Sequence, residues 1–261
     1  MVILIILLIL AAIYVFLVSP GNRALSETAG RDYAHRGLHT DAPENSLTAF
    51  RLAAEAGYGI ELDVQLSKDG EVYVFHDYSL ERMTGCKAKL SELCSDELDK
   101  LRLNGREEQI PRLSQVLGLV DGRVPLLVEL KGESTDVSLC PKVDALLSGY
   151  RGEYIVESFN PLLLYWYRRN RPEALRGQLY TNVVKSNGFT PLNLLLTLMA
   201  FNFLAKPDFI AYDEKRPGAL PVLLTTRLFR RESFVWTVRS LSEYEKRGSS
   251  FAIFEGFLPN K

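Results

Sequence analysis

Short hydrophobic runs alternate with amphipathic windows from Asp32 to the end of the chain. The runs, rich in β-branched and aromatic residues, predict strands at 32–35, 59–65, 71–76, 125–130, 153–158, 177–181, 208–212, 233–238 and 251–254. Between most of them the apolar spacing is helical, most clearly over 46–56, where Ser46 suits the N-cap and Gly57 the end. Strands that alternate with helices predict a parallel sheet with right-handed crossovers.

The number of strands predicts an α/β protein with an irregular TIM-type (β/α)8 barrel. Nine candidate strands are one too many, and the link between residues 65 and 71 is too short for a helix. One segment is therefore expected to be an elaboration. The window 78–110, after the third strand, is expected to be a small, mainly helical insertion. The 261 residues suit a single barrel domain, which typically takes about 250.

The N-terminal segment is hydrophobic throughout. Residues 2–18 carry no charge, Gly or Pro, and as a helix they would be about 26 Å long, near the lower limit for crossing a bilayer. We expect a single-pass transmembrane anchor at 1–18, a linker at 19–30 and the barrel at 31–261. A cleaved signal peptide and a buried core helix are the alternatives. The basic residues that follow the segment leave its orientation open.

A second apolar stretch covers residues 191–204. It has fourteen residues, two of them Asn, and is therefore too short and too interrupted to span a membrane. It has two interpretations, a buried helix of the barrel or an interfacial segment that dips into lipid. The membrane is thus an expected partner through the N-terminal segment and, in the second interpretation, through 191–204.

Composition narrows the possible functions. The 31 Lys and Arg balance 32 Asp and Glu, which argues against a nucleic-acid partner because such proteins need a basic surface. Hydrophobic residues make up 47% of the chain, as in globular proteins with a core. The three cysteines fit neither a metal motif nor a disulfide scaffold, although a Cys86–Cys94 bridge would be possible in an oxidising compartment. No obligate protein partner is evident.

Acidic residues lie where buried strands should be apolar. Strand alternation places Glu61 and Asp63 on one face of 59–65, and it pairs Glu129 with Lys131. Neighbouring carboxylates resist burial unless a cation compensates them. Since Mg²⁺ and Ca²⁺ prefer oxygen ligands, Glu61, Asp63 and Glu129 are candidate ligands of one divalent cation. The alternative is a solvated strand face with ordinary charges.

Two of the three histidines follow predicted strands. His35 and His76 are therefore expected at the carboxyl ends of barrel strands, where active sites of such barrels lie. Imidazoles suit acid–base catalysis near neutral pH. Arg36 and Lys131 are the cations that an anionic substrate would need. Three further residues are expected to orient these groups: Glu44, Asn45 and Asp77. For Glu44 and Asn45, which stand just before the helix at 46–56, the alternative is a plain capping role.

The chain resembles the glycerophosphodiester phosphodiesterases. The strongest match is the segment AHRGLHTDAPENSLTAFRLAAEAGYGIELDVQLSKDGEVYVFHD, with HRG, PEN before a helix, E-x-D, a K-D-G turn and H-D. Further along, VELKG, ESFNP and VWTV resemble later strands of the family, so the resemblance covers about residues 31–260. It implies a TIM-type barrel that hydrolyses a phosphodiester with one divalent cation.

The resemblance also implies roles for individual residues. The metal ligands would be Glu61, Asp63 and Glu129, and the acid–base pair His35 and His76. The phosphate ligands would be Arg36 and Lys131, and the pocket for the alcohol would be lined by Trp236 and Phe159. The chain departs from the family at its end, where Phe254-Glu255-Gly256-Phe257 stands in place of the usual Thr-Asp.

Three functions follow from these observations. The first is hydrolysis of glycerophosphodiesters to glycerol 3-phosphate and an alcohol. The second is a lysophospholipase D or phospholipase C-like activity on membrane lipid diesters. The third is an inactive, membrane-tethered binding module, which the presence of the whole candidate residue set argues against.

Overall fold

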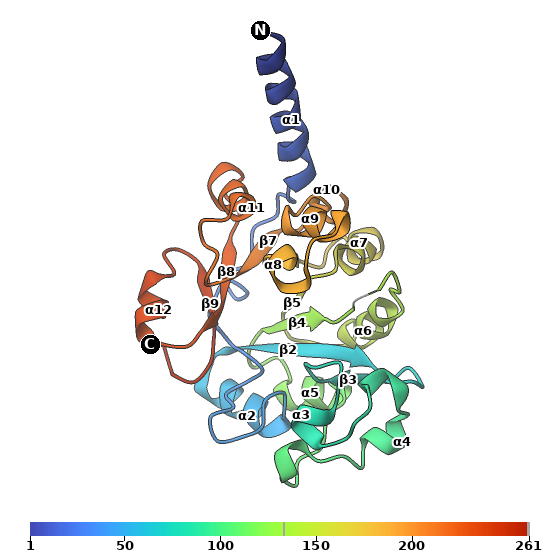
Figure 1. Ribbon diagram of the computed structural model, residues 1–261. Helices are drawn as coiled ribbons and strands as arrows, with labels where there is room; N and C mark the ends of the chain where they lie inside the picture. Colours follow the sequence, from blue (N-terminus) through green and yellow to red (C-terminus); the bar gives the residue numbers. More distant parts are fainter. Residues whose placement is uncertain (133, 260–261) are drawn as a thin grey trace.

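The computed structural model describes residues 1–132 and 134–259 and contains a closed barrel of eight parallel strands (Figure 1). The strands are β1 (Tyr33–Ala34), β2 (Gly59–Leu66), β4 (Leu126–Leu130), β5 (Tyr154–Ser158), β6 (Arg176–Tyr180), β7 (Phe209–Asp213), β8 (Ser233–Val238) and β9 (Phe251–Phe254). Strand β1 pairs with both β2 and β9 and so closes the ring. The predicted TIM-type barrel is confirmed.

The additional predicted strand is the expected elaboration. Strand β3 (Val72–Val74) runs antiparallel to the last residues of β2, Val64 to Leu66, and its Tyr73 also forms an isolated bridge with Arg112. The turn between them is tight: the Ser67 amide donates to the Glu71 carbonyl at 2.9 Å, and Gly70 has a φ of 84°. Strand β3 thus lengthens a hairpin on the barrel wall instead of joining the ring.

Short helical turns follow β3. They are α3 (Glu81–Thr84), η1 (Leu90–Glu92), α4 (Ser95–Leu98) and η2 (Leu103–Gly105). Their apolar side chains form a small cluster around Tyr73 that includes Leu80, Met83, Leu90 and Leu98. This cluster holds the turns against the hairpin and fixes the loop that precedes α3.

The remaining helices surround the barrel. They are α2 (Leu47–Ala56), α5 (Leu113–Val120), α6 (Leu139–Leu147), α7 (Pro161–Asn170), α8 (Val183–Asn187), α9 (Pro191–Thr197), α10 (Asn202–Ala205), α11 (Leu220–Leu223), the π-helical turn η3 (Leu224–Leu228) and α12 (Leu241–Lys246). Helix α2 begins and ends as predicted, because the Ser46 hydroxyl accepts from the Ala49 amide and Gly57 is left-handed. Along each strand, every second residue faces these helices, and the residues between them fill the barrel interior.

The N-terminal helix α1 (Val2–Val18) projects from one end of the molecule (Figure 1). Its last turn packs against the barrel, where Val18 is buried and the Phe16 ring contacts Phe203. Among the residues that the structure describes, no helix combines the length and the apolar character that a membrane crossing requires. The expected transmembrane anchor at 1–18 is therefore not supported, since part of this short helix is used to contact the barrel.

The second apolar stretch does not form one buried helix. It divides into α9, which has no buried residue, and α10; the buried residues of the stretch are Met199, Ala200 and Asn202, at and just before the start of α10. Leu192, Leu194 and Leu195 of α9 are exposed. All three cysteines are free thiols, so the alternative Cys86–Cys94 bridge is not formed.

Candidate active site

The carboxyl ends of the barrel strands surround a cleft of about 180 Å³. The polar residues that line it are His35, Arg36, Glu61, His76, Glu129, Glu157, Thr237 and Arg239. Its apolar lining consists of Phe159, Leu179, Trp236 and Ile253. Leu179 and Ile253 belong to the packed interior of the barrel, so the cleft lies on top of a solid core.

Three buried carboxylates converge at one side of the cleft. Glu61 and Asp63 come from β2, and Glu129 lies beside Asp63 on the neighbouring strand β4. One oxygen of each lies within 4.8 Å of the other two. Strand alternation explains this geometry, because Ile60, Leu62 and Val64 point to the helices while the acidic residues point inward.

Each carboxylate has a partner that fixes it. The Arg36 backbone amide donates to Glu61 Oε2 at 2.8 Å, and the Asn45 side-chain amide donates to Asp63 Oδ2 at 2.8 Å. Lys131 Nζ lies 2.8 Å from Glu129 Oε1 and 3.1 Å from Asp63 Oδ1. The carboxylates are therefore held in place by the chain itself.

The charges of this cluster do not balance. Burial raises the pKa of Glu61 well above its usual value, and the neighbouring Asp63 and Glu129 raise it further. Burial likewise raises the pKa of Glu129 to about 7, although Lys131 opposes the shift. For Asp63 the lowering effects of Lys131, His76 and Arg36 exceed that of burial, so its pKa lies below the usual range. The cluster thus resists full ionisation unless further positive charge is supplied.

A fourth buried carboxylate, Glu157, belongs to the same cleft and was not predicted. It lies beside Glu129 in the β4–β5 register, is 1% exposed, and its Oε2 has no hydrogen-bond partner. Four acidic side chains therefore gather around two cations, Arg36 and Lys131, while the third cation of the cleft, Arg239, pairs with Glu255. The oxygen-rich, negatively charged donor set fits a hard divalent cation. The strand alternation of 153–158, applied as it was to β2, would have indicated Glu157.

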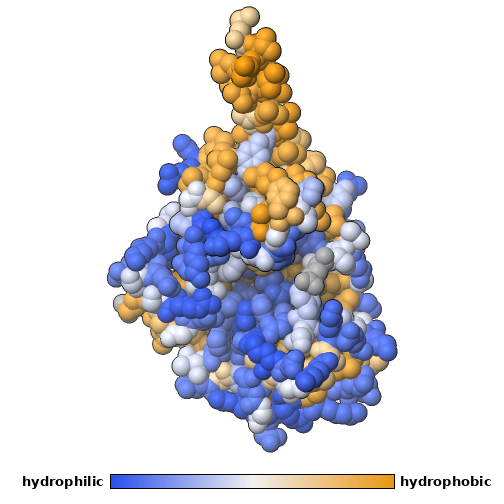
Figure 2. Space-filling view, viewed as in Figure 1, coloured by the Kyte–Doolittle hydropathy of each residue, from blue (hydrophilic) through white to orange (hydrophobic). Residues whose placement is uncertain are grey.

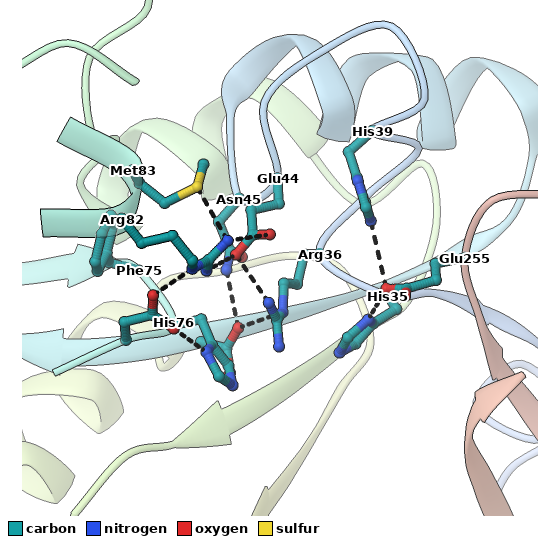
Figure 3. A network of polar contacts seen from close by, with 12 residues as sticks. His35, Arg36, His39, Glu44, Asn45, Phe75, His76, Arg82, Met83 and Glu255 are labelled. Atoms are coloured by element: carbon teal, nitrogen blue, oxygen red, sulfur yellow. Dashed lines mark hydrogen bonds and ion pairs between the residues drawn. The ribbon is translucent and has the colours of Figure 1, made fainter. Parts of the chain in front are cut away.

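His35 lies at the end of β1 and contacts the end of β9. Its Nδ1 is 2.6 Å from Glu255 Oε2, and Arg239 Nε donates to Glu255 Oε1 at 2.6 Å. His39 Nε2 lies 3.6 Å from the same carboxylate (Figure 3). Burial lowers the pKa of His35, while the hydrogen bond to Glu255 raises it in part. The residue that departs from the family pattern at the chain's end thus contacts a candidate catalytic histidine.

His76 lies on the other side of the carboxylates and has its own acidic partner. Its Nδ1 is 2.7 Å from Asp77 Oδ1. Arg82 contacts both Asp77 and Glu44, and its contact with Glu44 can be followed in Figure 3. Gln65, which was not predicted, holds this loop because its side-chain amide donates to the carbonyls of Phe75, His76 and Asp77. Burial lowers the pKa of His76, and the charge of Asp63 opposes the shift.

The loop after β1 places Arg36 over the carboxylates. Arg36 Nη1 donates to Glu44 Oε1 at 2.8 Å, and its Nε lies 3.5 Å from Asp63 Oδ2. Gly37 has a φ of 81°, and a Cβ at this position would lie 2.8 Å from the Ala49 backbone. Glycine is therefore required in the HRG sequence for the loop to approach α2 this closely.

Two aromatic side chains form the opposite wall. The rings of Phe159 and Trp236 meet edge to face at 5.6 Å, with an interplanar angle of 89°. Phe159 follows β5, and Trp236 belongs to β8. The structure thus brings every predicted site residue into the cleft or into contact with a residue that lines it. Such an arrangement suits an anionic substrate with an apolar or neutral substituent.

Comparison with known proteins gives a consistent result. The model of the Glycerophosphoryl diester phosphodiesterase family matches residues 35–241. A glycerophosphodiester phosphodiesterase from Caldanaerobacter subterraneus subsp. tengcongensis is 35% identical over 160 residues, which cover 56% of this chain and 65% of that protein, slightly less than two thirds. Glycerophosphodiester phosphodiesterase 1 from Bos taurus is 27% identical over 294 residues, covering 94% of this chain and 85% of that protein.

Solved structures share the fold. The Oleispira antarctica phosphodiesterase in complex with the product sn-glycerol-3-phosphate has a TM-score of 0.70 and 23% identity, and the match covers 86% of this chain and 92% of that one. At this identity the likeness establishes the barrel architecture and leaves the chemistry to the residues of the cleft.

Proposed function

Because this chain belongs to the glycerophosphoryl diester phosphodiesterase family, we propose that it hydrolyses glycerophosphodiesters to glycerol 3-phosphate and an alcohol. The observation that carries the proposal is the convergence of Glu61, Asp63 and Glu129 in one cleft that His35 and His76 also line or flank. An inactive binding module would have no need of this costly cluster of buried charge.

The cationic side chains are proposed to bind the phosphate. A phosphodiester carries one negative charge, and more charge develops on its oxygens as the leaving alcohol departs. Arg36 lines the cleft and offers a planar fork for phosphate oxygens, while Lys131 adds a point charge beside Glu129. Positive groups fixed in this position stabilise the developing charge without reorganising, which is usually the largest catalytic contribution.

The two histidines are proposed to transfer protons. One accepts a proton from the attacking oxygen as the new P–O bond forms, and the other donates a proton to the alkoxide as the old P–O bond breaks. Their acidic neighbours, Glu255 for His35 and Asp77 for His76, fix the ring orientation and leave the other nitrogen for the substrate. Burial lowers the pKa of both imidazoles, which favours the neutral form of whichever ring accepts the proton.

Glu61, Asp63 and Glu129 are proposed to hold one Mg²⁺ or Ca²⁺ ion. Their oxygens lie close together and carry an excess of negative charge, which is the reason the ion fits. When bound, the ion would supply Lewis-acid stabilisation of the phosphate oxygens.

Phe159 and Trp236 are proposed to contact the alcohol portion of the substrate. Their edge-to-face pair forms an apolar wall beside the phosphate-binding groups. The second candidate function, hydrolysis of lysophospholipids or other lipid diesters, is favoured by the exposed leucines of α9, which follows the carboxyl end of β6, a strand that contributes Leu179 to the cleft.

A product assay separates these functions. The protein is incubated with glycerophosphocholine or lysophosphatidylcholine, with Mg²⁺ or Ca²⁺ and after exhaustive chelation, and the released alcohol and phosphomonoester are quantified. We expect metal-dependent release of glycerol 3-phosphate from glycerophosphocholine. Turnover of lysophosphatidylcholine alone would favour the second function, and full activity after chelation would exclude the metal from the mechanism.

A further inference from the structure

Helix α1 is apolar on all of its sides and stands clear of the barrel. Every residue from Met1 to Ile13 is exposed, and Met1, Ile3 and Leu8 are 98%, 74% and 62% exposed. Figure 2 shows this helix as a hydrophobic column above a largely hydrophilic body. Exposed apolar surface of this extent in a single element marks a binding surface.

The base of α1 is attached to the barrel by specific contacts. The Tyr14 hydroxyl donates to the Leu198 carbonyl at 3.3 Å, and the rings of Phe16 and Phe203 lie 5.6 Å apart. The Lys206 ammonium lies 6.0 Å from the Phe16 ring. Since these contacts join α1 to the α9–α10 region, the direction of the helix relative to the barrel is fixed.

The barrel surface next to this attachment is also apolar. Exposed hydrophobic side chains project from the segment that contains α8 and α9 and from the segment that contains α11 and η3: Phe189, Leu192, Leu194, Leu195, Leu220 and Leu228. Figure 1 places α9 and α11 at the end of the molecule that carries α1, and Figure 2 shows hydrophobic side chains at this end. We call α1 together with these six side chains the apolar face.

The two segments that carry the exposed side chains of the barrel surface contain charges of one sign only. Residues 183–207 and 215–231, which form the two shoulders of the apolar face, contain no Asp or Glu. Their basic residues are Lys185, Lys206, Lys215, Arg216, Arg227, Arg230 and Arg231. The chain as a whole has a net charge of −1, so this end of the molecule is basic while the remainder is acidic.

We propose that the apolar face docks on the surface of a lipid bilayer that contains anionic lipids. A protein contact on one side of α1 would leave its other apolar side chains in water, whereas lipid covers the helix on every side. The free part of α1, residues 2–13, is about 18 Å long at 1.5 Å per residue. It enters the hydrocarbon core from the side of the bilayer on which the protein docks. The basic shoulders then lie at the depth of the phosphate headgroups.

The docking also positions the cleft. Helices α8 and α9 follow β6, and α11 follows β7, at the ends of the strands where the cleft opens. When these segments contact lipid, one rim of the cleft lies against the headgroups. This step rests on the proposed function, because it implies that diesters held in or released at a membrane reach the site directly.

Tryptophan quenching by lipids with brominated acyl chains tests the docking in the full-length protein. Leu192 is replaced by Trp in one variant and Leu228 in another, and Leu241→Trp is the matched control because Leu241 is similarly exposed on α12. We expect vesicles of brominated phosphatidylcholine and phosphatidylglycerol to quench the added emission of the first two variants and to leave that of the control unchanged. No quenching of Leu192→Trp and Leu228→Trp would overturn the proposal.

A charge variant tests the headgroup contact. Arg227→Gln should weaken binding to mixed anionic vesicles by about fivefold, and Arg51→Gln on α2 is the control with no expected effect. Equal binding of both variants would refute the role of the basic shoulders. A different outcome is a dimer that forms without lipid, in which Leu192→Trp is shielded from an aqueous quencher and does not respond to brominated lipid. That result would show that the apolar face contacts protein and would overturn the proposal. Hydrolysis of soluble glycerophosphocholine by the same variants is measured separately, so failure of docking is distinguishable from failure of the proposed function.

Discussion

Replacement of Glu255 by Gln should change how activity depends on pH. The Glu255 carboxylate accepts a 2.6 Å hydrogen bond from His35 Nδ1 and raises the pKa that burial lowers. The amide of Gln keeps the shape and can still bond to the ring but has no charge. The pKa of His35 should therefore fall further in Glu255→Gln, and the limb of the pH profile that reports this histidine should move to lower pH.

The contacts of Glu255 set the size of the shift. Hydrogen bonds to charged groups contribute about 1.5–3 kcal/mol, which corresponds to about one to two pH units at 1.36 kcal/mol per unit. The Glu255 side chain is 20% exposed and shares its charge with Arg239, whose Nε donates to it at 2.6 Å. We therefore expect the lower end, a shift of about one pH unit with a loss of activity of about tenfold.

The measurement is kcat/KM for glycerophosphocholine across pH, with thermal unfolding as a control for folding. Glu214→Gln is a matched variant, because Glu214 follows β7 as Glu255 follows β9 and its side chain is 25% exposed. Glu214→Gln should leave the profile unchanged. If Glu255→Gln lowers stability without moving the limb, Glu255 supports the fold and does not act through His35.

Three further outcomes are expected. His76→Ala should lower turnover by about 10²–10⁴-fold with unchanged circular dichroism, as for the loss of a proton-transfer group; near-normal turnover would exclude His76 from this role. In chelator, the contribution of Glu129 to stability should be full below pH 4.5 and be lost as pH rises through about 7, because the folded protein holds the Glu129 proton more tightly than the unfolded chain does. Mg²⁺ or Ca²⁺ should therefore raise the melting temperature more at pH 8 than at pH 5, and an equal rise would contradict the cation site. Gly37→Ala should destabilise the protein by about 1 kcal/mol or more in urea unfolding, because Ala resists the φ of 81° and its Cβ would collide with Ala49; an unchanged midpoint would mean that the loop relaxes.

Local patterns in the sequence sufficed for the barrel and for most of the cleft. Strand alternation placed Glu61, Asp63 and Glu129 on inward faces, and the structure brings their oxygens within 4.8 Å of one another. Ser46 and Gly57 marked the ends of α2 because capping depends on neighbouring residues alone. These features need only the periodicity of a strand or helix and the rule that parallel strands end together.

What the sequence did not reveal depends on contacts between distant residues. Glu255 meets His35 only because β9 pairs with β1, and a lone acid after a strand resembles an ordinary exposed residue. The N-terminal apolar run predicted a helix, but its hydropathy does not tell how much of the helix packs against the barrel. The Tyr14 and Phe16 contacts with the α9–α10 region decide that, and they have no signature in the sequence.

The barrel closes at the seam where β1 pairs with β9, and this pairing brings His35 to Glu255. Activity should therefore depend on this last step of barrel formation. His35 is synthesised early, whereas its acidic partner Glu255 follows 220 residues later in the chain, after the last strand of the barrel. A nascent chain that already holds seven parallel strands would still lack the pair that spans the seam. The onset of hydrolysis during translation would therefore report the moment at which the two ends of the barrel join.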